Sequence, residues 1–147
     1  MSNWTFCTVA WGRHAGWWVD HALGTVLPDL GRWPVRPDYL VYTDQAGRER
    51  IEAAPAFAAL RLVADGTFLP IDPRPLSAAQ GFYRTWTLAQ QDAFERAGHG
   101  WLVSLLPDTL YGRGSILELL NTGEAHRVVC ASYFSANEGI LSHVKAP

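Results

Sequence analysis

Cysteine is scarce in this sequence, which holds only Cys7 and Cys130. Both fall in apolar, strand-like runs, so two buried free thiols in a reducing compartment explain them better than a disulfide bond or a metal site. The sequence also lacks a basic segment followed by an apolar run near its start, the pattern of a secretory signal. We therefore expect a cytoplasmic protein.

Charge of either sign is sparse as well, and it is scattered along the chain. Twelve lysines and arginines stand against fourteen aspartates and glutamates, which gives a formal net charge of −2 over 147 residues. Without a basic patch the chain offers no electrostatic site for nucleic acid. Its apolar runs are far shorter than the roughly 18 residues of a membrane span. With 48% apolar residues, the composition predicts one globular domain, residues 1–147, with its own core.

Several motifs of common enzymes are absent. The sequence has no Gly-x-Ser-x-Gly elbow, no Cys–His signature and no dinucleotide-binding Gly-x-Gly-x-x-Gly. Serine hydrolysis and hydride transfer are therefore disfavoured. His14 and His21 would share one face of a helix, but without a third ligand they are better explained as surface histidines than as a metal site.

What the sequence does contain is a regular alternation of strand-like and helix-like segments. Apolar and β-branched runs predict strands at 4–10, 39–42, 67–71, 101–106 and 127–134. Helical spacing of apolar residues predicts helices at 14–30, 48–62 and 77–97, and a short one from Ser115. Pro55 is expected to break or shift the second of these helices. This order predicts an α/β fold, a three-layer sandwich around a mostly parallel sheet with right-handed crossovers.

The longest predicted helix, 77–97, has two contrasting faces. Its apolar stripe consists of Ala78, Phe82, Trp86, Ala89, Ala93 and Ala97. Its opposite stripe consists of the polar residues Gln80, Arg84, Thr87 and Gln91. We expect the apolar stripe to pack on the sheet. Arg84 would then lie either on a solvated face or close enough to the sheet edge to bind a phosphate.

Polar residues follow the predicted strands at the edge where a parallel sheet binds ligands. The strand ends are Trp11-Gly12, Thr43-Asp44, Asp72 and Pro107-Asp108. A carboxylate at such an end can bind a hard cation such as Mg²⁺ or Mn²⁺, and Asp108 is the first candidate. The alternative is that Asp108 is a turn residue bonded to the backbone near Leu110, and that Asp44 is an ordinary turn start.

The turn at 111–115 is a candidate anion site. Its two glycines would let the backbone approach an anion, the helix that begins at Ser115 would offer free N–H groups, and Arg113 would add a guanidinium. The offset between Ser115 and Glu118 is that of a capping box. A solvent-exposed turn before a capped helix is the alternative, and the lysine and spacing of a Walker loop are missing.

The segments WTFCTVAWG and YLVYTD, with the Arg84 helix leading into WLVSLLPDTL, resemble the nucleotide-binding half of a GT-A type glycosyltransferase. The resemblance covers Trp4 to Phe134. It implies a Rossmann-like, GT-A-like fold that binds a nucleoside diphosphate sugar and transfers the sugar. The roles it implies are nucleoside binding by Trp11, Gly12, Thr43 and Asp44, phosphate binding by Arg84, and binding of Mn²⁺ or Mg²⁺ by Asp108.

The sequence departs from that family in two respects. Pro107 precedes Asp108 and no second aspartate pairs with it, where the family carries Asp-x-Asp. The chain also ends soon after its last predicted strand, where the family usually carries an acceptor-binding half and a catalytic base, so the catalytic residue is unknown. We expect either a partner subunit that completes the site or a reduced, non-catalytic relative.

Tryptophan, by contrast, is abundant, with seven in the chain. Trp17, Trp33 and Trp101 lie near predicted element edges, where a flat ring can stack on a sugar or fill an interface, although core packing is the default. The alternative function is a non-catalytic α/β binding or assembly module, a homo-oligomer or part of a complex, with exposed tryptophans as its interface. A flavodoxin-like domain with an unrelated ligand is a third hypothesis.

Overall fold

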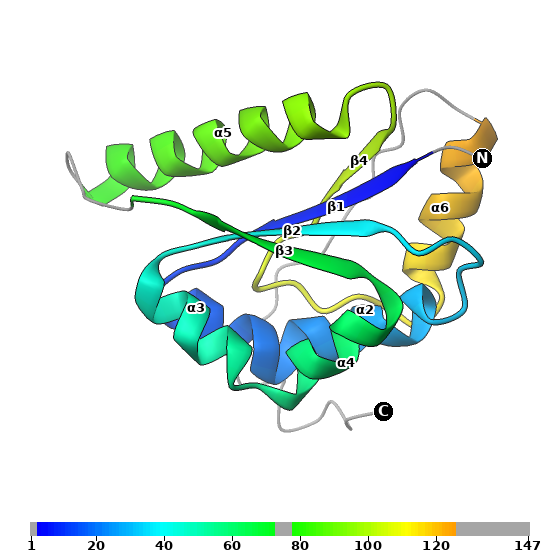
Figure 1. Ribbon diagram of the computed structural model, residues 1–147, viewed down its shortest axis with the longest axis horizontal. Coiled ribbons are helices and arrows are strands. Elements are labelled where there is room, and N and C mark those ends of the chain that lie inside the picture. The colour runs from blue at the N-terminus through cyan, green and yellow to red at the C-terminus, as the bar shows by residue number, and fades with distance from the viewer. Residues whose placement is uncertain (1–2, 73–77, 126–147) are drawn as a thin grey trace.

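A computed structural model of the protein describes residues 3–72 and 78–125 (Figure 1). Its strands are β1 (Trp4–Val9), β2 (Asp38–Thr43), β3 (Asp65–Pro70) and β4 (Trp101–Ser104). Its helices are α1 (Arg13–Trp17), the π-helical segment η1 (Trp18–Ala22), α2 (Leu23–Leu30), α3 (Gln45–Glu52), α4 (Pro55–Val63), α5 (Ala78–Ala97) and α6 (Ser115–Ala125). The strand predicted at 127–134, with Cys130, lies outside the described residues. None of the described helices is long and apolar enough to cross a membrane.

The four strands form one parallel sheet in the order β3-β2-β1-β4. β1 lies between two neighbours, and its Cys7 is opposite Leu40 of β2 and Ser104 of β4. β2 continues the sheet to β3, where Asp38 pairs with Asp65. This arrangement confirms the α/β class and the parallel sheet expected from the sequence, and the fold is Rossmann-like.

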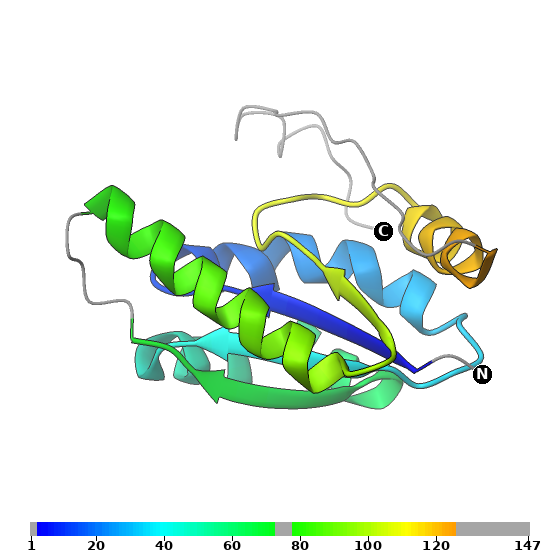
Figure 2. The ribbon, with the colours of Figure 1, turned by 90° about the horizontal axis from the view of Figure 1, so that it is seen from above.

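Helices cover both faces of the sheet and give the molecule three layers (Figures 1 and 2). α1 to α4 and α6 lie on one face, and α5 crosses the other face alone. Successive β1 side chains point to opposite faces. Trp4 and Phe6 therefore belong to the core beneath α1 to α4 and α6, whereas Cys7 and Val9 belong to the core beneath α5. Because β1 is buried on both faces, its sequence is a nearly continuous apolar run.

The inner face of α5 is built from small residues. Its buried residues at four-residue spacing are Thr85, Ala89, Ala93 and Ala97. The predicted apolar stripe is thus confirmed at its last three alanines, while Trp86 is only half-buried. Polar contacts help to hold this helix to the sheet: among the described residues the Tyr42 hydroxyl donates to Asp92 Oδ2 at 2.8 Å, and Gln90 Nε2 donates to Ser104 Oγ at 2.7 Å.

Two prolines act differently on the helices. Pro28 lies inside α2, and the helix continues to Leu30 instead of ending earlier. Pro55 breaks the predicted helix 48–62, as expected, because it opens α4 after α3 has ended. At that first position of a helix the missing N–H of proline leaves no hydrogen bond unmade.

All four described strands differ from the predicted ones by one or two residues at their ends, and β3 and β4 differ most. β3 begins at Asp65, because the Asp65 N–H donates to the Pro37 carbonyl at 2.9 Å and starts the pairing with β2. β3 therefore starts two residues before the strand predicted at 67–71. β4 ends at Ser104, earlier than predicted, although the Leu105 N–H still donates to the Cys7 carbonyl at 2.9 Å.

Of the tryptophans, Trp4 and Trp18 are buried in the core and the other five are half-buried. Trp4 is buried, stacks on Trp101 with ring centroids 5.3 Å apart, and meets Trp33 edge-on at 6.1 Å. A Cβ at Gly123 would collide with the Trp4 ring, so α6 packs here only with glycine. All seven tryptophans are described, and none of them is exposed. An interface of tryptophans could therefore use only the half-buried rings, and it stays a prediction.

Candidate functional site

The strand order reverses between β1 and β4. From β1 the chain runs outward through β2 to β3, and then returns through α5 to β4 on the other side of β1. In open parallel sheets ligands bind beyond the carboxyl ends of the strands at such a reversal. The candidate site is this edge of the sheet. One feature is unusual for the fold class: α6, which follows β4, lies on the same face as α1 and α2 and not beside α5 (Figure 1).

The Trp11-Gly12 turn is the first part of the candidate site, directly after β1. Trp11 is half-buried and packs against the core beneath α5. Gly12 has a φ of 53°, a left-handed conformation that favours glycine. A Cβ at Gly12 would meet no atom within 4 Å, so the space beside this turn is open. Of the predicted site residues, these two have the geometry most suited to a close-lying ligand.

Ser104, at the end of β4, lies on the strand next to β1 at the same edge of the sheet. Its side chain is exposed and is held by Gln90 of α5. Cys7 is the β1 partner of Ser104, and burial raises the pKa of its thiol to about 11. Cys7 is therefore a neutral thiol near pH 7 and no nucleophile. Sequence reasoning missed Gln90 and Ser104; the only signal was one serine within the apolar run that opens at Trp101.

At the end of β2 the structure places Thr43 and Asp44 next to β1, but in structural roles. Asp44 Oδ1 accepts a hydrogen bond from the Gly47 N–H at 2.8 Å and thereby caps α3. A Cβ at Gly47 would collide with Thr43 Oγ1, so this tight cap requires glycine. The Thr43 hydroxyl is buried and has no hydrogen-bond partner among the described residues. A ligand can reach Asp44, but it cannot reach the Thr43 hydroxyl without a rearrangement.

Asp108 lies in an exposed turn beyond the end of β4. Within residues 3–72 and 78–125, no group of three or more His, Cys, Asp or Glu side chains is placed to hold a metal ion. The Leu106 N–H donates to the Tyr111 hydroxyl at 3.0 Å, so this loop folds back on itself. Burial, together with the nearby charge of Asp108, raises the pKa of Tyr111 to about 12. One exposed carboxylate does not make a cation site by itself, and the metal role of Asp108 stays a prediction.

A buried carboxylate from α2, which the sequence analysis did not identify, lies at the N-terminus of α6. Asp29, on α2, is only 1% exposed. Its Oδ1 accepts a hydrogen bond from the Gly114 N–H at 3.0 Å, and its Oδ2 accepts one from the Ile116 N–H, also at 3.0 Å. The N–H groups expected to be free at this helix N-terminus are thus already bonded to an anion of the chain itself.

Arg84 and Arg113, the two arginines predicted to bind phosphate, lie in different parts of the molecule. Both are exposed, and neither forms an ion pair with a described residue. Arg84 is in the first half of α5, which leads away from the carboxyl end of β3. Arg113 precedes Gly114, which is bonded to Asp29 near the C-terminal end of α2, on the other face of the sheet. Of the two, only Arg84 lies on an element that starts from the carboxyl edge of the sheet, and its side chain is on the exposed side of that helix.

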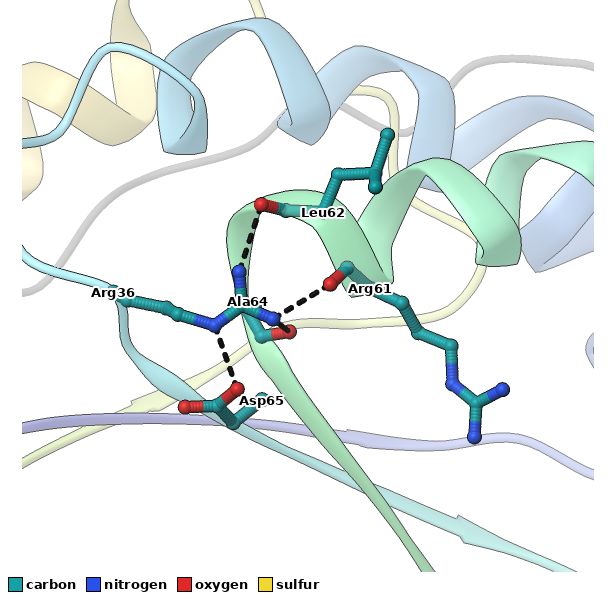
Figure 3. A network of polar contacts seen from close by, with 5 residues as sticks. All are labelled: Arg36, Arg61, Leu62, Ala64 and Asp65. Carbon is teal, nitrogen blue, oxygen red and sulfur yellow. Dashed lines mark hydrogen bonds and ion pairs between the residues drawn. The ribbon is translucent and has the colours of Figure 1, made fainter.

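Figure 3 shows a separate polar cluster at the C-terminal end of α4. Arg36 Nε donates to Asp65 Oδ1 at 2.6 Å, and the two terminal nitrogens of Arg36 donate to the carbonyls of Leu62 at 2.7 Å, Arg61 at 2.6 Å and Ala64 at 2.9 Å. A helix end leaves such carbonyls without partners, so the guanidinium is a C-cap. All three nitrogens of this guanidinium are engaged, which gives the cluster a structural role.

Comparisons with models of protein families, with curated proteins and with solved structures find no match to this chain. The GT-A resemblance of the sequence therefore stays a hypothesis. The structure brings four of its predicted nucleotide-binding residues to the ends of the adjacent strands β1 and β2: Trp11, Gly12, Thr43 and Asp44. Asp108 follows β4, on the other side of β1, and Arg113 lies elsewhere.

Proposed function

We propose that the chain binds the nucleoside diphosphate part of a nucleotide sugar at the carboxyl edge of β1 and β4. The observation that carries this proposal is the reversal of strand order at a turn with open space beside Gly12. The backbone at Gly12 can approach a ligand closely, and the half-buried Trp11 ring offers a flat surface for a base. Asp44 Oδ2 makes no hydrogen bond to a described residue, which leaves it to accept one from a ribose hydroxyl.

In this proposal Arg84 is the main residue that neutralises the negative charge of the diphosphate. Arg84 has no competing carboxylate among the described residues, and guanidinium groups bind phosphate through two parallel hydrogen bonds. Ser104 and Gln90 supply uncharged hydrogen-bonding groups near the same edge. The described residues do not form a protein-only site for Mn²⁺ or Mg²⁺, so Asp108 could share a cation only with the phosphates themselves.

Sugar transfer is the activity that the GT-A resemblance implies for such a donor site. No residue of the described chain is assigned as its catalytic base, and the acceptor would have to be bound by a partner subunit or by residues outside 3–72 and 78–125. We therefore propose donor binding as the function of this part of the chain. A cytoplasmic protein meets nucleotide sugars in solution, and the buried free thiol of Cys7 suits that reducing compartment.

Calorimetric titration with UDP and GDP, each with and without Mn²⁺, tests the proposal. We expect micromolar binding of at least one nucleotide. Arg84→Ala should weaken it about tenfold, since loss of one charge-assisted contact costs about 1.4 kcal/mol or more. The matched control is Arg32→Ala, which removes an exposed arginine from the loop after α2 and should leave the affinity unchanged.

Two results would contradict parts of the proposal. Absence of binding for both nucleotides in all conditions would remove the donor-binding function. If binding occurs but Asp108→Ala has the same affinity with Mn²⁺ as the unchanged protein, Asp108 has no cation role, while nucleotide binding itself stands.

A further inference from the structure

The outer face of α5 is more apolar than a solvated helix requires. In the described chain four large apolar side chains are exposed, and three of them lie on this helix: Tyr83 at 70%, Leu88 at 55% and Phe94 at 68%. The fourth, Leu62, lies on α4. Isolated exposed apolar residues are common, but three on one helix form a candidate contact surface.

Helical geometry aligns Tyr83 and Phe94. Eleven residues correspond to about three turns, so the two rings lie about 16 Å apart along nearly the same line of the helix. Thr87 and Gln91 lie between them, and both are exposed. This line lies on the exposed side of the helix, about a third of a turn round from the stripe that starts at Thr85 and faces the sheet. We define the outer face of α5 by its exposed residues Tyr83, Arg84, Thr87, Leu88, Gln91, Phe94 and Glu95.

This outer face is complementary to itself in an antiparallel arrangement. If two copies of α5 cross near Ala89, Tyr83 of one copy meets Phe94 of the second copy, and Arg84 meets Glu95 of the second copy. A two-fold axis produces each contact twice. Neither Arg84 nor Glu95 forms an ion pair within the described residues. Aromatic pairs and opposite charges are the contacts that stabilise such helix pairs.

Repulsion between like charges disfavours the parallel arrangement. Two parallel helices would place Arg84 against Arg84 of the second copy and Glu95 against its own counterpart, and like charges in contact are repulsive. The same two charges attract in the antiparallel pair. We propose that the outer face of α5 is a homodimer interface in which two copies of this helix pack antiparallel. One helix pair is at the small end of specific interfaces, so the dimer should dissociate in the micromolar range.

Sedimentation velocity of the full chain without nucleotide, from about 1 µM to about 500 µM, measures this equilibrium. We expect a monomer–dimer equilibrium in the unchanged protein. Phe94→Glu should weaken it at least tenfold, because it places a charge in the apolar part of the interface. Leu62→Glu is the matched control, since Leu62 is 78% exposed but lies outside the outer face of α5. Circular dichroism confirms that each variant is folded.

A charge exchange tests the antiparallel register. Arg84→Glu and Glu95→Arg should each weaken the dimer, and the two changes together should restore it, because the opposite charges again meet across the two-fold axis. A monomer at all concentrations would overturn the proposal. So would a dimer that Phe94→Glu does not weaken, or a double variant no tighter than the single ones. Arg84 is used in both proposals, so the two are told apart by Phe94→Glu, which leaves Arg84 in place: it should weaken the dimer measured without nucleotide and leave the nucleotide affinity of the monomer unchanged.

Discussion

Asp29 and Thr43 are two buried polar side chains that differ in their hydrogen bonding. The Asp29 carboxylate accepts hydrogen bonds from the N-terminal N–H groups of α6, whereas the Thr43 hydroxyl has no partner among the described residues. A buried anion without partners would cost several kcal/mol, so the helix N-terminus is what permits Asp29 in the core. In return, the carboxylate satisfies N–H groups of Gly114 and Ile116 that would otherwise be unbonded.

We predict that Asp29→Ala lowers the free energy of unfolding by about 2–4 kcal/mol, because it leaves buried N–H groups unsatisfied and opens a small cavity. Urea-induced unfolding measures the change. The matched control is Asp108→Ala, which removes the same chemical group from an exposed turn and should change stability by less than about 0.5 kcal/mol. Equal effects of the two changes would contradict the capping role of Asp29.

Only one weak feature of the sequence points to this cap. Asp29 lies between the buried residues Val26 and Leu30 of α2, so its burial could be expected from helical periodicity. Its partner could not, because the contact with Gly114 joins residues 85 positions apart. Local patterns carry no information about such a pairing. The prediction of free N–H groups after the turn at 111–115 is therefore wrong, because Asp29 accepts hydrogen bonds from them.

At the scale of elements, the C-terminal end of α4 depends on one side chain from a neighbouring loop. Arg36 bonds three carbonyls at this helix end and also pairs with Asp65 at the start of β3. The Arg36 side chain is 45% exposed and that of Asp65 62%, so solvent screens the ion pair itself. The contribution to stability comes mainly from the carbonyls, which have no other partner in the helix.

Arg36→Met should therefore lower the free energy of unfolding by about 1–2 kcal/mol, while Asp65→Asn should cost less than about 0.5 kcal/mol. Arg36→Lys keeps the charge but cannot reach several carbonyls at once, and we expect an intermediate loss. Thermal unfolding of the three variants at neutral pH ranks them. A larger loss for Asp65→Asn than for Arg36→Met would show that the ion pair dominates instead.

Most elements were predictable, since strands and helices here carry clear patterns. Pro55 correctly divides two helices, and the helix starting at Ser115 begins where its sequence predicts. The polar stripe predicted for α5 is exposed at Arg84, Thr87 and Gln91, but the sequence analysis did not predict the exposed rings of Tyr83 and Phe94 beside it. Aromatic residues in a helix usually indicate the buried face. Here alanines and Thr85 take that face, and the rings are left outside.

At the scale of the whole molecule, three tyrosines are kept protonated by the fold. Burial raises the pKa of Tyr39 and of Tyr42 above its usual range, the latter with help from the hydrogen bond to Asp92, and burial raises the pKa of Tyr111 to about 12. All three ionise more easily in the unfolded chain, near pH 10. The stability that depends on them is complete below that pH and is lost as pH rises above it.

We predict that the free energy of unfolding falls steeply above about pH 10, by about 1.4 kcal/mol per pH unit for each tyrosine that is protonated only in the folded state. Urea unfolding at pH 8 to 11.5 measures the slope, and phenolate absorbance reports ionisation. Tyr39→Phe should reduce this slope by the contribution of one tyrosine, about 1.4 kcal/mol per pH unit. Loss of the hydrogen bond to Thr8 should also lower the free energy of unfolding at neutral pH. A flat profile up to about pH 11.5 would contradict this account.

The strand order was the part of the architecture that sequence could not supply. Alternating strands and helices predict a parallel sheet, but they do not say which strands are neighbours. The reversal between β1 and β4, on which the candidate site depends, is known only from the structure. Trp11 and Gly12 could be expected at a strand end, whereas Gln90 and Ser104 meet only because α5 crosses that edge.

The contact of Asp29 with α6 also has a consequence for folding during translation. When α2 leaves the ribosome, Gly114 is still 85 residues from being synthesised, so the carboxylate has no helix to accept hydrogen bonds from. A charge without partners resists burial. We therefore expect this side of the core to stay open to water during translation and to close only after α6 has emerged. An interrupted chain would display its unfinished interior, which is what quality-control proteases and chaperones recognise.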